Sequence, residues 1–205
     1  MLYRKAARLA VQSLILNKDI TMGTYIRTCA ETRSADGWKP VGYGAIPPAS
    51  RHDESDDHEA PAYSEPFMYQ DYGMFGLFAD VRNYSQSQVL AEPRGFPDDI
   101  SEEALRHLVP EVWQLESGWG WGEPPSASVA ERIARSEASC YGCSWLSAAE
   151  LTEFDYDQRF VDQRTTPQQE TTYRAFLGER YFQQIDALKA LSAKDEVRVL
   201  FRFVG

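Results

Sequence analysis

The clearest strand pattern in the chain is EVRVLFRFV at residues 196–204. Its odd-numbered residues from Val197 to Phe203 are apolar, whereas Arg198 and Arg202 lie at even positions, so an extended chain separates apolar and basic faces. A second alternating stretch, TYIRTCAETR at residues 24–33, predicts another strand. Because an isolated strand is not stable, we expect these two strands to pair in one sheet.

Turn and capping signals divide the rest of the chain. Asp36 and Gly37 predict a turn before a return strand at 38–43. Ser101 and Ser147 are N-cap signals, and Pro167 is placed as the first residue of a long helix. Residues 46–66 are acidic and interrupted by prolines, so we expect a loop there. The helices we expect span 69–82, 102–108, 127–137, 148–154 and 167–191.

These elements predict an α+β fold, with a small antiparallel sheet formed by the N- and C-terminal strands, packed helices and long loops. We expect a single domain over 22–205, preceded by an amphipathic helix or extension at 1–21. A chain of 205 residues is long enough for one substantial core.

The chain is acidic, with a formal net charge of −10 at pH 7. This charge disfavours a duplex nucleic acid partner, because phosphate contacts need clustered Lys and Arg. No apolar run approaches the length of a membrane span, so we expect no membrane partner.

Carboxylates gather in two segments that could meet a basic protein. An ordinary solvated surface is the alternative. The partner-binding candidates are Asp53, Glu54, Asp56, Asp57, Glu59, Asp98, Asp99, Glu102 and Glu103.

The three cysteines do not predict a disulfide framework. Cys140 and Cys143 have the CxxC spacing of half a structural zinc site, with Cys29 or His107 as possible completing ligands. The alternative is two ordinary cysteines in a packed turn, and we expect no cofactor.

Several polar side chains have the chemistry to bind a small anionic ligand. Guanidinium groups offer paired donors to phosphate or carboxylate, and Trp145 could stack on a base. The same residues could equally belong to solvated strand faces and structural turns. The ligand-binding candidates are Arg27, Glu31, Arg33, Arg82, Asn83, Tyr84, Glu92, Arg94 and Trp145.

The opening MGTYIRTCAETR at 22–33, followed by Gly37 and Trp38, resembles that of an uncharacterised family common in phage and prophage genomes. That family typically opens Met-Gly-Cys-Asp-Ile-His, followed by a Glu and a Trp. Later pieces resemble it too: GLFADVRN at 76–83, EPRGFPDDIS at 92–101, SWLSAAEL at 144–151 and VRVLFRF at 197–203. The chain departs from the family at 24–27, and at Tyr141 and Cys143, where the family often has His.

The resemblance implies a phage-encoded accessory protein in the cytoplasm of a bacterial host. It supplies no activity, and the departures favour a protein without catalysis. Our leading hypothesis is a non-catalytic protein that binds and inhibits a host factor, a defence or basic nucleic-acid-handling protein, through its acidic surface. The alternatives are a protein that sequesters a phosphorylated nucleotide signal, and an enzyme of unknown reaction.

Overall fold

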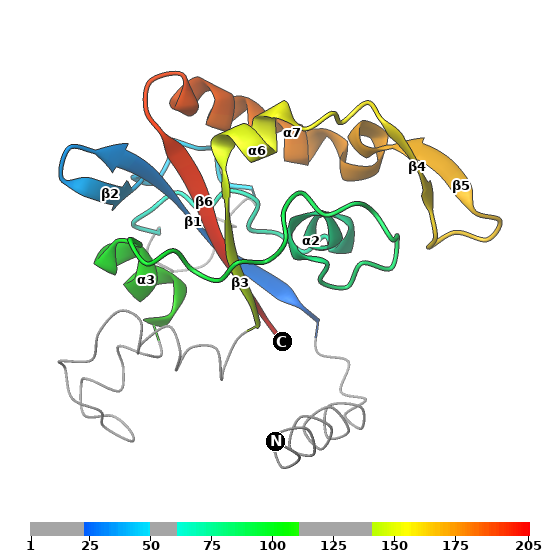
Figure 1. The fold of residues 1–205 in the computed structure, drawn as a ribbon, viewed down its shortest axis with the longest axis horizontal. Coiled ribbons are helices and arrows are strands. Elements are labelled where there is room, and N and C mark those ends of the chain that lie inside the picture. Colours follow the sequence, from blue (N-terminus) through cyan, green and yellow to red (C-terminus); the bar gives the residue numbers. More distant parts are fainter. Residues whose placement is uncertain (1–22, 50–60, 111–140) are drawn as a thin grey trace, which may run out of the picture.

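The computed structural model describes residues 23–49, 61–110 and 141–205. A four-stranded antiparallel sheet in the order β2-β1-β6-β3 lies at its centre (Figure 1). Its strands are β1 (Tyr25–Ser34), β2 (Gly37–Pro40), β3 (Tyr141–Ser147) and β6 (Val197–Val204). The predicted α+β class and the pairing of the N- and C-terminal strands are confirmed.

β1 and β6 pair in a register that runs from Tyr25 opposite Val204 to Thr32 opposite Val197. This register places most apolar residues of both strands on one face, where Ile26 and Phe203 are buried, and leaves Cys29 and Leu200 on the other. It places Glu31 directly opposite Arg198 on the other face. The two faces therefore differ in chemistry.

Of the described helices, α2 (Tyr72–Ala79), α6 (Ala148–Glu153) and α7 (Tyr173–Ser192) cover the apolar face. They bury Phe78, Leu151 and Tyr181 against β6 residues such as Phe201. In the described part of the chain, the short helix α3 (Glu102–Leu108) covers the other face with Leu105 and Leu108. α3 does not line the recess that lies beside Arg198 at the end of this face. Residues from other segments line it.

The caps set most helix limits. Ser101 caps α3 and Ser147 forms the predicted capping box of α6 with Glu150, so both short helices are confirmed. α2 is shorter than the predicted 69–82, because Asp71 caps its start and Asp80 adopts a left-handed conformation (φ 58°) that ends it.

The prediction of a helix over 167–191 is wrong at its N-terminal end. Residues 159–172 form a hairpin of β4 (Arg159–Asp162) and β5 (Gln169–Thr172), and α7 begins only after it. The Thr172 side chain accepts a hydrogen bond from the Ala175 backbone N–H and so caps α7. The β-branched Thr171 and Thr172 favour the extended hairpin over a first helical turn.

Residues 141–147, which carry one half of the CxxC motif, form β3 rather than a turn. β3 pairs with β6 through Ser144 to Ser147, after an irregularity that follows Tyr141. The predicted N-terminal extension, the 127–137 helix and the acidic residues 53–59 lie outside the described residues. No helix in the described ranges has both the length and the apolar character needed to cross a bilayer.

Candidate functional site: the Trp38–Trp145 recess

A buried ion pair forms the base of the candidate site. Glu31 is 0% and Arg198 2% exposed. Arg198 Nε and Nη2 lie 2.8 and 2.7 Å from Glu31 Oε2. The other oxygen, Oε1, accepts a hydrogen bond from the backbone N–H of Ser101 (2.9 Å). The carboxylate thus joins β6 to the residue that caps α3, and the expectation of a solvated strand face is wrong at Glu31.

Asp99 closes the outer side of the same guanidinium. Arg198 Nη1 donates to Asp99 Oδ1 (2.7 Å), and Nη2 donates to its backbone carbonyl (3.1 Å). Trp38 Nε1–H and Arg33 Nη1 donate to Asp99 Oδ2, at 2.9 and 3.2 Å. The hydrogen bond from Arg198, the largest cause, holds the pKa of Asp99 below its ordinary value, with further contributions from Trp38 and Arg33. Asp99 is therefore ionised at neutral pH.

Two indole rings stand over these charges. The Arg198 guanidinium carbon lies 3.9 Å from the centre of the Trp38 ring and 5.8 Å from that of Trp145. Arg94 lies 3.7 Å from the Trp145 ring centre and donates to the Trp145 carbonyl and to Glu150 Oε2 (2.7 Å). These distances are those of cation–π contacts, so indoles and guanidiniums alternate along the sheet.

Between the two indoles lies a recess of about 230 Å³. Two guanidiniums, of Arg33 and Arg198, and two carboxylates, of Asp99 and Glu196, line it. Glu31 lies directly behind Arg198, and Arg94 pairs with Glu150 beside Trp145, so four carboxylates accompany three guanidiniums. The electrostatic balance of the recess favours a cationic group over an anionic one.

The ligand-binding candidates separate into two groups. Glu31, Arg33, Arg94 and Trp145 come together at the recess. Arg27 and Glu92 are exposed and do not line it. The remaining three, Arg82, Asn83 and Tyr84, occupy a loop that contacts Thr24, near the opposite end of β1.

The partner-binding acids also separate. Asp98, Glu102 and Glu103 are exposed near the start of α3. Asp99 instead takes part in the Arg198 network. Asp53, Glu54, Asp56, Asp57 and Glu59 lie outside the described residues.

Among the charged and aromatic residues that line the recess, sequence reasoning missed three: Trp38, Glu196 and Arg198. A signal for Arg198 was present, because the sequence placed it on the polar face of a strand expected to pair with the strand of Glu31. In the antiparallel register of these two strands, Glu31 and Arg198 lie opposite each other. The two indoles converge only through the tertiary fold.

The cysteines do not form a described metal cluster. Cys29 and Cys143 are buried in the apolar layer beneath α3, and Cys140 lies outside the described residues. Burial, the main cause, raises the pKa of Cys29 well above its ordinary value, so Cys29 is a neutral thiol at pH 7. Across residues 23–49, 61–110 and 141–205, no three His, Cys, Asp or Glu residues are grouped as metal ligands.

A second recess of about 440 Å³ adjoins α3, lined by Tyr63, Glu102, Glu103, Arg106 and His107. His107 Nε2 lies 2.8 Å from Glu65 Oε1, and a carboxylate in this position orients an imidazole. Among the described residues that line this recess, none is a serine or cysteine that could act as a nucleophile.

No family model, curated protein or solved structure matches this chain. The Trp38–Trp145 recess draws its residues from four segments that lie far apart in the sequence. The opening segment and its following Trp supply Glu31 and Trp38, 92–101 supplies Asp99, 144–151 supplies Trp145, and 197–203 supplies Arg198.

Proposed function

We propose that this protein is a non-catalytic binding protein that takes a lysine or arginine side chain of a basic partner into the Trp38–Trp145 recess. One observation carries the proposal. The Arg198 guanidinium is committed to Glu31 and Asp99, while indole rings and the exposed carboxylates of Asp99 and Glu196 line the recess. An incoming cation would meet aromatic rings and negative charge.

The resemblance to the phage family extends this proposal to a biological setting. The protein would be a phage-encoded accessory protein in the cytoplasm of a bacterial host, and its partner a host factor, such as a basic defence or nucleic-acid-handling protein. Exposed Asp98, next to Asp99, and exposed Glu102 and Glu103 at the start of α3 support this direction, because an acidic surface speeds the approach of a basic protein.

The alternative, a phosphorylated nucleotide, fits this recess less well. Pockets that enclose a drug-sized ligand measure roughly 300–1,000 Å³, whereas this recess measures about 230 Å³. A guanidinium has five N–H donors, and Arg198 makes four contacts to Glu31 and Asp99. Too few donors remain for a fork-like grip on phosphate.

Catalysis at the recess is also less well supported. Glu31 accepts hydrogen bonds from Arg198 and from a backbone N–H, and Asp99 accepts from three side chains. The lowered pKa of Asp99 keeps it ionised and a poor proton donor, and the Glu31 carboxylate is enclosed by its hydrogen-bond donors. Glu196 remains accessible, but it suits attraction of a cation better than proton transfer.

The proposal is tested with defined probes on the full chain. Three titrations use hexa-arginine peptide, hexa-glutamate peptide and AMP, followed by NMR of the Trp indole N–H signals. We expect only hexa-arginine to shift the Trp38 and Trp145 signals saturably. A response to AMP without a response to hexa-arginine would favour the nucleotide alternative and reject the proposal.

Glu196→Lys is the informative variant, because Glu196 is exposed and makes none of the contacts of the buried pair. We expect it to weaken hexa-arginine binding by about tenfold, as charge reversal at a rim lowers the association rate. Asp186→Lys on α7 changes the net charge equally but lies away from the recess, and should bind as wild type. Equal losses in both variants would reduce the effect to overall charge.

A further inference from the structure

Arg82 lies at the other end of the sheet, far along β1 from the Trp38–Trp145 recess. Its Nε donates to Thr24 Oγ1 (3.1 Å), and its Nη1 donates to the Tyr84 hydroxyl (3.0 Å). The Thr24 hydroxyl also lies 2.8 Å from the Tyr141 hydroxyl. Threonine and tyrosine hydroxyls, not carboxylates, therefore orient this guanidinium.

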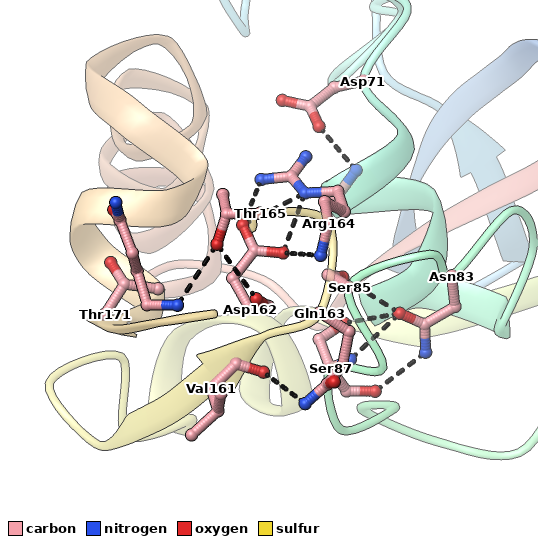
Figure 2. Close-up of polar contacts among 12 residues, drawn as sticks. Asp71, Asn83, Ser85, Ser87, Val161, Asp162, Gln163, Arg164, Thr165 and Thr171 are labelled. Carbon is pink, nitrogen blue, oxygen red and sulfur yellow. Dashed lines mark hydrogen bonds and ion pairs between the residues drawn. The ribbon is translucent and has the colours of Figure 1, made fainter. Parts of the chain in front are cut away.

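The loop that carries Arg82 is tightly held. Asn83 Oδ1 accepts from Ser85 Oγ and from the backbone N–H and Oγ of Ser87, while Nδ2 donates to Asp80 and to the Ser87 carbonyl. Figure 2 shows the Asn83 amide facing Ser85 and Ser87, next to the β4–β5 hairpin. The loop also joins that hairpin through the Gln163 backbone N–H and the Ser85 carbonyl (3.2 Å).

The same loop stores backbone strain. Asp80, Arg82 and Gln86 all have positive φ, at 58°, 50° and 53°. Non-glycine residues in this region are strained and persist only where surrounding contacts hold them. Arg82 and Tyr84 are thus presented in a fixed orientation although both are exposed.

Arg82 retains hydrogen-bonding capacity. Two of its five N–H groups are used on Thr24 and Tyr84, which leaves Nη2 and the second hydrogen of Nη1. In the described part of the chain, no carboxylate forms an ion pair with Arg82, in contrast to Arg94 and Arg198. The surface around it carries phenol rings: Tyr84 is 53% exposed and Tyr141 39%.

We propose that Arg82, Tyr84 and Tyr141 form an oxyanion-binding site, separate from the recess, that takes a carboxylate or phosphate group next to an apolar or aromatic moiety. The unused N–H groups on Nη1 and Nη2 match two oxygens of such a group. The tyrosine rings supply amphipathic contact area beside it. A pre-oriented guanidinium loses little side-chain freedom on binding.

The test uses NMR of the arginine Nε–H signals in the full-length protein. The probes are benzoate and phenyl phosphate, with benzyl alcohol as the uncharged control of similar shape. We expect the Arg82 signal to shift saturably with at least one oxyanion and not with benzyl alcohol. A response to benzoate would identify a carboxylate ligand, and a stronger response to phenyl phosphate would identify a phosphate ligand.

Arg82→Lys keeps the charge and the backbone preference but removes the fork, so it should weaken the bound oxyanion at least about tenfold. Arg180→Gln removes an exposed arginine that lies over the Tyr69 ring, and should leave affinity unchanged. An Arg82 signal unmoved by both oxyanions would overturn the site. So would equal affinity in the Arg82→Lys variant, or an equal loss in Arg180→Gln.

Discussion

Glu31 and Arg198, 167 positions apart in the chain, lie directly opposite each other on adjacent strands and form an ion pair from which water is excluded. Such a pair contributes little net stability compared with apolar residues of equal volume, because both charges lose their hydration. Removing one partner is different, since it leaves a buried charge uncompensated. The pairing of β1 with β6 therefore depends on a charged residue from each end of the chain.

The first prediction concerns this dependence. Glu31→Leu should lower the free energy of unfolding by about 3–5 kcal/mol, the usual cost of breaking a buried pair. The double variant Glu31→Leu with Arg198→Met should lose much less than the sum of the single losses. Urea denaturation of the three variants measures this coupling. Additive losses would mean that the two charges are not energetically coupled.

The second prediction concerns acid stability. The pKa of Asp99 is lowered by its hydrogen bond from Arg198, so the unfolded chain binds a proton at a higher pH than the folded one. Its stabilising contribution is complete above about pH 4, the ordinary range of an aspartate, and is lost as pH falls through the lower folded value. Asp99→Asn should flatten the fall of the urea midpoint between pH 5 and pH 2. The neighbouring exposed Asp98→Asn is the matched control and should follow wild type.

The third prediction concerns the buried hydroxyl groups of Tyr156 and Tyr181, which lie in the core under α2, α6 and α7. The Tyr156 hydroxyl donates to the Leu151 carbonyl and lies 2.7 Å from the Tyr181 hydroxyl. Burial, the main cause, raises the pKa of Tyr156 to about 12, so both groups stay neutral. Tyr156→Phe deprives the Tyr181 hydroxyl of this partner and should cost about 1–3 kcal/mol. Tyr181→Phe leaves Tyr156 bonded to Leu151 and should cost less; the reverse order in urea denaturation would contradict this hydrogen-bond arrangement.

The fourth prediction concerns Gly76 in α2. Alanine normally stabilises a helix interior by about 1 kcal/mol relative to glycine. Here a Cβ would lie 2.6 Å from Asn83 Oδ1, within the hydrogen-bonded centre of the 80–87 loop. Gly76→Ala should therefore destabilise the protein and weaken the Arg82 site. In an Asn83→Ala background the same change should cost less, and an unchanged cost would place the clash elsewhere.

The strand signals were sufficient to predict the class of fold. Alternation at 24–33 and 196–204 depends only on which side chains prefer water, and a strand with one apolar face needs a sheet partner. The helix N-caps at Ser101 and Ser147 were also predicted correctly, because a capping side chain binds backbone groups within three residues of itself. The hairpin before α7 was missed, since Pro167 is equally compatible with a turn and with a helix start.

The amino-acid sequence by itself determined the paired terminal strands and the short capped helices, because each follows from interactions between near neighbours or from a simple two-residue period. Only the tertiary structure decided that Glu31 is buried, that Trp38 and Trp145 border one recess, and that Arg82 lies apart from them. Those facts depend on strand register and on contacts between residues more than a hundred positions apart. A pattern along the sequence does not specify how close such residues lie in space.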